Sequence, residues 1–141
     1  MFIVIRCKPP LIKFSSSKIP FHDGMYEESA LLEFNCCNCK LPLSGNLLSN
    51  ISRGNEWFRK TAQSDQVYLS TLFNLKHSVE GHNHIPYARF QNGDIAYFCL
   101  LICQNCNSTN IAVIEFYEMQ PARYIAKLQG LAVRDETNEN T

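Results

Sequence analysis

Two short cysteine motifs constrain this chain more than any other feature of its sequence. Each contains two cysteines separated by two residues, Cys36 and Cys39 in the first motif and Cys103 and Cys106 in the second. The two intervening residues form a tight turn that places both sulfurs on one side of the backbone. Together the motifs supply the four thiolates of a tetrahedral Zn²⁺ site. The spacing therefore predicts a structural zinc site, closed by four protein ligands and without catalytic activity.

The length and composition of the chain suit one folded domain. The 141 residues are 45% apolar, enough for a hydrophobic core with the metal as a supplement. We predict a zinc-stabilised domain over residues 1–134 and a disordered polar tail over residues 135–141. The formal net charge is zero, which argues against sequence-independent attraction to nucleic acid or to an anionic membrane.

The first residues of the chain and the three remaining cysteines bear on the cellular compartment of the protein. The apolar run Met1–Ile5 is too short for a signal peptide or a membrane span, so we expect a cytoplasmic protein without membrane association. In a reducing cytosol, paired cysteine motifs are more often metal sites than disulfides. We therefore predict Cys7, Cys37 and Cys99 to be free thiols, either in the core or near the surface.

Several apolar runs predict strands. A strand near residues 28–35 leads into the first cysteine motif, and a strand over residues 95–102 leads into the second. Between residues 87–90 and residues 95–102, Asn92-Gly93 predicts a hairpin with a type I′ turn. Two further strands are expected at residues 2–6, as a sheet edge, and at residues 111–117.

The 63 residues between the motifs, numbers 40–102, are too many for a loop and predict a helical insertion. Apolar spacing indicates a helix from Asp65 to His77, a shorter turn from Glu56 to Thr61, and a turn at Ser44–Asn46 after the first motif. A C-terminal helix is expected over Ala122–Val133, after Pro121. Its predicted apolar face comprises Tyr124, Ile125, Leu128, Leu131 and Ala132.

An apolar strand that ends in a C-x-x-C motif thus occurs twice. In residues 28–43 and 94–118 these strands and cysteines resemble zinc-ribbon proteins as a broad class. The resemblance implies an α+β fold, with a small antiparallel sheet that carries two zinc knuckles. The helical insertion and the C-terminal helix would pack beside this sheet. The long insertion departs from compact ribbons and leaves open whether both knuckles share one zinc ion.

The histidines allow two further interpretations. His77, His82 and His84 could form a second metal site, but Glu80–His84 also has the composition of an exposed polar loop, which we favour. His82-Asn83-His84 followed by a C-x-x-C motif superficially resembles the HNH nucleases. That resemblance implies His84 as general base with Asp94 or Asn92 in support. It breaks down after the second knuckle, where the family has a helix with a metal ligand and residues 111–117 are strand-like.

Nucleic-acid binding and thiol–disulfide chemistry are two alternatives to protein binding. Trp57, Phe58, Arg59 and Lys60, with Arg53 nearby, form the one basic and aromatic stretch that could bind nucleic acid, although burial of the two aromatic side chains explains it better. A thiol–disulfide enzyme needs its first cysteine at a helix N-terminus, whereas both motifs follow strands. We therefore expect a zinc-binding interaction or regulatory protein with a protein partner, bound through the C-terminal helix or an exposed strand edge. The nucleic-acid-binding ribbon and the nuclease remain as alternatives.

Overall fold

The computed structural model describes residues 3–7, 21–23, 31–82, 84–120 and 123–135. These ranges contain nine strands and two helices. In chain order they are β1 (Ile3–Cys7), β2 (Phe21–Asp23), β3 (Leu31–Asn35), β4 (Pro42–Asn46), α1 (Leu47–Lys60), α2 (Gln63–Leu72), β5 (Lys76–Glu80), β6 (Ile85–Arg89), β7 (Ala96–Ile102), β8 (Thr109–Gln120) and β9 (Arg123–Asp135).

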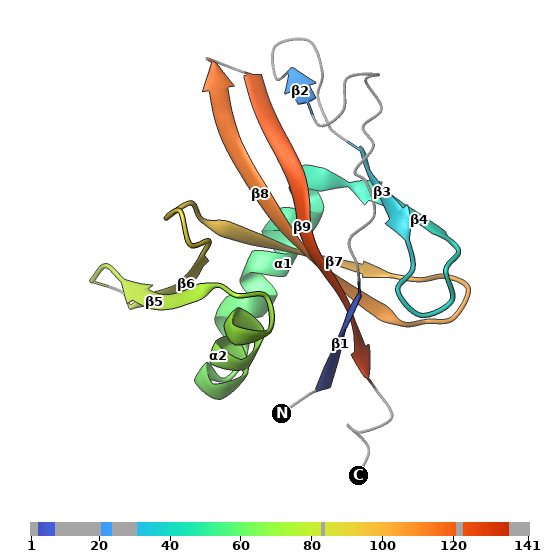
Figure 1. Cartoon of the computed structure of the whole chain (residues 1–141), viewed down its shortest axis with the longest axis horizontal. Coiled ribbons are helices and arrows are strands. Elements are labelled where there is room, and N and C mark those ends of the chain that lie inside the picture. The colour runs from blue at the N-terminus through green and yellow to red at the C-terminus, as the bar shows by residue number, and fades with distance from the viewer. Residues whose placement is uncertain (1–2, 8–20, 24–30, 83, 121–122, 136–141) are drawn as a thin grey trace.

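An antiparallel sheet in the order β1-β9-β8-β7 forms the centre of the fold (Figure 1), and β2 pairs with the other half of β9, on the same side as β1. Two separate hairpins, β3–β4 and β5–β6, flank this sheet. Every described pairing is antiparallel. The segment between the cysteine motifs therefore contains both helices and four strands, two more strands than the predicted pair at residues 87–90 and 95–102.

Both faces of the central sheet are buried, and β8 shows this directly. Ala112 and Ile114 belong to a core with the β3–β4 hairpin, whereas Ile111 and Val113 belong to a second core with α2 and the β5–β6 hairpin. Because successive side chains of a strand point to opposite faces, a sheet covered on both sides needs a continuous apolar run. This explains why residues 111–114 are apolar without alternation.

Helix α1 covers part of the free edge of β7, the last strand of the sheet. The side chain of Asn55 accepts a hydrogen bond from the backbone N–H of Phe98 at 3.1 Å. A Cβ atom on Gly54 would lie only 1.9 Å from the carbonyl oxygen of Phe98. Helix and strand can approach this closely only because residue 54 has no side chain. The ring of Phe58 then stacks on that of Phe98, with centroids 4.6 Å apart.

The junction between the helices is closed by Gln66 of α2, whose side chain is buried. Its amide nitrogen donates to the carbonyl oxygens of Phe58 at 2.9 Å and Thr61 at 3.1 Å, which lie at the C-terminal end of α1. Its amide oxygen contacts Nε2 of His77 at 2.9 Å. These bonds satisfy carbonyl groups that a helix end leaves unpaired. They also give His77 a structural role.

The predicted C-terminal helix over Ala122–Val133 is wrong, because residues 123–135 form strand β9. The ladder with β8 shifts register between Leu128 and Gly130, which leaves Gln129 as an extra residue. That bulge interrupts the alternation of buried side chains and produces an apolar spacing that resembles one turn of a helix. Pairing with β8 on one side and with β1 and β2 on the other outweighs intrinsic helix propensity. Asp135, which we assigned to the disordered tail, belongs to β9, and residues 136–141 of that predicted tail lie outside the described ranges.

The helices of the insertion also differ from the prediction. Residues 56–61 are not a short turn but the end of α1, whose N-cap is Asn46, with Oδ1 accepting from the N–H of Ser49 at 2.9 Å. The predicted turn at residues 44–46 is the end of β4. Helix α2 ends at Leu72 rather than at residue 77, because Asn74 adopts a positive φ of 57° and stops it.

The strands that lead into the motifs were predicted correctly in type, as were the strands near residues 2–6 and 111–117. The Asn92-Gly93 turn is not type I′, since only Gly93 has a positive φ. Strand β6 pairs with β5 and meets the segment before β7 only at the bridge between Arg89 and Ile95, so the predicted hairpin is reduced to one pair.

The close approach of α1 to β7 gives a first prediction. Substitution Gly54→Ala should lower the free energy of unfolding by about 2 kcal/mol or more, despite the better helix propensity of alanine, because the added methyl group meets backbone that cannot move aside. Urea denaturation followed by circular dichroism measures this. Ser52→Ala, on the exposed side of the same helix, is the matched control and should change stability little. Equal stability of the two variants would contradict the packing described.

Candidate metal centre

The first cysteine motif forms the turn of the β3–β4 hairpin. The backbone N–H of Cys36 donates to the carbonyl oxygen of Leu41 at 2.7 Å, and the N–H of Lys40 donates back to the carbonyl oxygen of Cys36 at 2.9 Å. Lys40, directly after the second cysteine, has a positive φ of 69°. This left-handed residue reverses the chain and allows both cysteines to face the same side of the turn.

The second motif repeats this construction in the β7–β8 hairpin. The N–H of Cys103 donates to the carbonyl oxygen of Ser108 at 2.9 Å, and the N–H of Asn107 donates to the carbonyl oxygen of Cys103 at 2.8 Å. Asn107 has a positive φ of 61° and occupies the position equivalent to Lys40. The sequence similarity between the two strand-and-motif units is therefore a similarity of structure.

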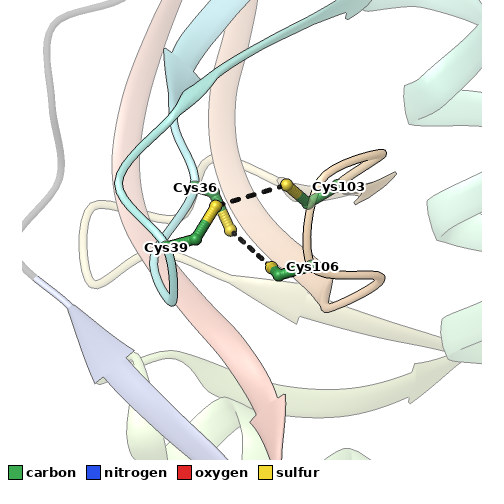
Figure 2. Close-up of side chains that lie close together, drawn as sticks. All are labelled: Cys36, Cys39, Cys103 and Cys106. Carbon is green, nitrogen blue, oxygen red and sulfur yellow. Dashed lines mark hydrogen bonds between the residues drawn. The ribbon is translucent and has the colours of Figure 1, made fainter.

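The two hairpin turns face each other and bring four sulfurs together (Figure 2). The Sγ atoms of Cys36 and Cys106 lie 3.7 Å apart, and those of Cys39 and Cys103 lie 3.5 Å apart. All four lie within 4.8 Å of one another. A tetrahedral ion with metal–sulfur bonds of about 2.3 Å has its sulfurs roughly 3.8 Å apart. The geometry thus fits one ion shared by both motifs.

Asn110, at the start of β8, supports this site from a fully buried position. Its amide nitrogen donates to Sγ of Cys36 at 3.4 Å, and its oxygen accepts from the backbone N–H of Cys37 at 2.8 Å. A second link runs from the amide of Asn38 to the hydroxyl of Ser108 at 3.1 Å. The first knuckle is therefore tied to the second hairpin by polar side chains as well as by the sulfurs.

The surroundings of the sulfurs lower the pKa of two of the four cysteines. Hydrogen bonds from the hydroxyl and the backbone N–H of Ser108 are the main reason that the pKa of Cys106 is lowered to about 6. Burial opposes ionisation of Cys36, but backbone N–H groups in the turn and the amide of Asn110 outweigh it and lower its pKa. At Cys103 the N–H of Cys106 lowers the pKa, yet burial and the neighbouring thiols raise it to about 11. A divalent cation would displace the remaining protons on binding.

The arrangement can hold a metal ion but leaves it no open coordination position, because the four cysteines already complete a tetrahedron. The four predicted ligands, Cys36, Cys39, Cys103 and Cys106, are thus brought together by the fold. These cysteines form the one group of at least three potential metal-ligating side chains found among the described residues. Such a centre stabilises structure and does not activate water.

Two of the other cysteines can be placed. Cys99 is fully buried on β7, as expected for a core thiol, and burial raises its pKa to about 12, so it is unreactive. The prediction of a free thiol is wrong for Cys37, which is disulfide-bonded. The side chain of Cys7 lies outside the described part of the chain.

The histidines do not gather into a second site within the described residues. His77 contacts Gln66, whereas His82 and His84 are exposed in the loop between β5 and β6, in agreement with the favoured interpretation. His84 and Asp94 lie beyond opposite ends of β6, whose five residues span about 16 Å. The pairing that the nuclease resemblance implies is therefore absent. Asn92 instead contacts Asp94 at 3.2 Å within its own turn.

The side chains of the basic and aromatic stretch, residues 57–60, lie in different surroundings. Phe58 is buried, and Trp57 packs edge-on against Phe98 with centroids 6.4 Å apart. Arg59 lies over the ring of Tyr87, and Lys60 pairs with Glu56 at 2.8 Å. The stretch therefore does not form one continuous basic surface on α1.

Sequence reasoning missed Asn110 and Ser108, which complete the surroundings of the sulfurs. Ser108 could have been found, because it lies two residues after a ligand, where a hydroxyl can reach the sulfur. Asn110 gives no such local signal. Its contact with Cys36 joins residues 74 apart in the chain, and only the tertiary fold creates it.

Comparisons with protein-family models, with curated proteins and with solved structures found no match to this chain. Neither α1 nor α2, the helices of the described residues, is long and apolar enough to cross a membrane.

The buried amide of Asn110 gives a second prediction. Asn110→Ala leaves the N–H of Cys37 unpaired in the interior and should lower the free energy of unfolding by about 1–3 kcal/mol. It should also weaken metal binding roughly 10- to 100-fold, as loss of a group that supports a ligand does. Chemical denaturation and competition with a chromophoric chelator measure the two effects. Asn105→Ala, in the exposed part of the second knuckle, is the control. Equal behaviour of both variants would contradict a supporting role.

The left-handed backbone at Lys40 gives a third prediction. Lys40→Gly should be more stable than Lys40→Ala by about 1 kcal/mol, because only glycine adopts a positive φ without strain. Both variants lose the hydrogen bond from Nζ of Lys40 to the carbonyl oxygen of Cys37, so their difference isolates the backbone term. Thermal unfolding of the metal-loaded variants tests this. A more stable alanine variant would show that the turn is built differently.

Proposed function

We propose that this chain is a small zinc-stabilised binding protein, in which Cys36, Cys39, Cys103 and Cys106 hold one structural Zn²⁺ and the surface around them binds a protein partner. The observation that carries the proposal is the set of four sulfurs at tetrahedral spacing, contributed by two equivalent hairpin turns. Two knuckles that face each other across one ion are the arrangement of a zinc ribbon.

The donor set supports zinc as the ion. Four thiolates in a tetrahedron select Zn²⁺ or iron, and zinc adds no redox chemistry to a site that has no open position. When bound, the ion would supply folding free energy, because the unfolded chain has no preformed site. The residues of this chain would do the rest: the turns aim backbone N–H groups at the sulfurs, and Asn110 holds the first knuckle against β8.

A protein partner is supported by charge. The chain has no net charge, and the basic residues of α1 are dispersed rather than gathered, so the phosphate contacts that give nucleic-acid affinity have little basis here. No described residue pair supports the nuclease either. The nucleic-acid and nuclease alternatives are therefore less well supported than protein binding.

Metal analysis tests the centre and gives a fourth prediction. Protein purified under reducing conditions should contain one equivalent of zinc by mass spectrometry. Cys103→Ser should lose it and unfold or aggregate, because removal of a ligand removes folding free energy. Cys99→Ala, which alters a buried cysteine outside the site, should keep one equivalent. A folded protein with less than about half an equivalent of zinc, or one that carries iron instead, would overturn the proposed centre.

Affinity capture from the native host tests the partner. A bound protein that survives nuclease treatment and is lost with Cys103→Ser would support the proposal. Retention on DNA or RNA that falls steeply with salt would favour the nucleic-acid alternative instead.

A further inference from the structure

A cleft of about 1030 Å³ lies beside the metal centre. One wall is β4, another is the face of α1 that carries Asn50, Arg53 and Trp57, and a third is the end of β7 with the second knuckle. Figure 1 shows these elements: the β3–β4 hairpin and the β7–β8 hairpin project to the same side of the molecule, and α1 continues directly from β4. The residues of the cleft therefore belong to the insertion, to the second hairpin and, through Arg134, to β9.

The outer edge of β7 contributes backbone hydrogen-bonding groups to this cleft. In an antiparallel pair, hydrogen-bonded and non-hydrogen-bonded residue pairs alternate. The hydrogen bond from Cys103 to Ser108 shows which residue pairs of β7 and β8 are the hydrogen-bonded ones. By this alternation Leu101 forms a hydrogen-bonded pair with β8, whereas the N–H and C=O groups of Leu100 and Ile102 point away from β8. The next group outward along β7, the N–H of Phe98, is taken by Asn55. Within the described residues, no hydrogen bond from α1 or β4 reaches Leu100 or Ile102.

The side chains around this edge combine apolar surface with positive charge. Ile102 is 59% exposed and Leu41 is 46% exposed, so both contribute apolar surface to the cleft. The charged residues of the lining are Arg53 and Arg134, and no aspartate or glutamate belongs to it. Arg134 already has an interaction partner, so Arg53, whose guanidinium donates to Oδ1 of Asn50 within the cleft, is the cation that the cleft offers beside its apolar strip and strand edge.

We infer that this cleft binds an extended, acidic peptide segment of a protein partner, which adds as a strand to the free edge of β7. Outward N–H and C=O groups at alternate residues match the backbone of an extended chain, and this is how peptides add to sheet edges. The charge of the lining selects acidic side chains. The inference rests on the proposed function, because the second knuckle, held by the metal, forms one end of the cleft.

Nuclear magnetic resonance on ¹⁵N-labelled, zinc-loaded protein tests the inference. The probe is a pool of synthetic octapeptides in which glutamate alternates with random apolar residues, and the comparison pool has lysine in place of glutamate. The acidic pool should shift the amide signals of Leu100 and Ile102 and slow their hydrogen exchange, and the lysine pool should not. These amides become protected only if a peptide pairs with the strand edge itself.

Three variants add specificity to the test. Arg53→Glu, in the cleft, should weaken binding of the acidic pool by about tenfold. Arg59→Glu makes the same charge change on the same helix outside the cleft and should bind like the wild type. Ile102→Pro removes one outward N–H without removing a bond to β8 and should abolish the protection. Zinc content and the remaining amide signals confirm that each variant is folded, and the arginine pair decides the question if the proline variant does not fold.

Three outcomes would overturn the inference: no protection of Leu100 and Ile102 at millimolar peptide, equal binding of both pools, or equal weakening by both arginine variants. Protection of the same amides by an eight-nucleotide single strand, but not by peptide, would instead identify a nucleic-acid site. Each result is separable from failure of the proposed function. A protein that holds one equivalent of zinc, and whose captured partner is unaffected by Arg53→Glu, would bind that partner elsewhere.

Discussion

The approach of four sulfurs across two hairpin turns is the contact on which the rest of this structure depends. It joins Cys36 to Cys106 and Cys39 to Cys103, pairs that are 70 and 64 residues apart in the chain. The β3–β4 hairpin has only two strands, too few for stability in isolation. Its side chains complete the core on one face of the central sheet. The contact between the sulfurs of the two turns therefore fixes the position of the β3–β4 hairpin on the central sheet.

The second constraint is the edge of β7. A sheet that ends in a free strand exposes unpaired backbone groups, and proteins cover such edges to avoid unwanted pairing. Here α1 covers only part of the edge, through Gly54 and Asn55 against Phe98. Beyond Phe98, the end of β7 and the face of α1 that carries Asn50 and Arg53 line the cleft. The same glycine that permits close packing at one point thus determines where the strand edge becomes accessible.

The sequence predicts what is encoded by short-range spacing. Both cysteine turns, the strands that enter them and the identity of the four clustered cysteines follow from local pattern, because each turn is built from consecutive residues. The C-terminal strand does not follow, since the bulge at Gln129 produces helix-like spacing and only pairing with β8 reveals the strand. The start of α1 was missed for another reason: Ser44-Gly45-Asn46 has turn composition, yet Asn46 serves as the cap of the following helix. Asn110 acts across the fold and has no local signature.

A metal ion held by these four thiolates would contribute to stability and not to activity, because its coordination would leave no position for a substrate. Function then depends on what the centre positions. The second knuckle fixes the end of β7, and Ile102 is the residue directly before its first ligand. The outward groups of Leu100 and Ile102 are therefore presented at a defined place relative to α1 only while the two hairpins are held together. Binding at this edge and occupancy of the metal site should be thermodynamically linked, because each favours the same arrangement of the hairpins.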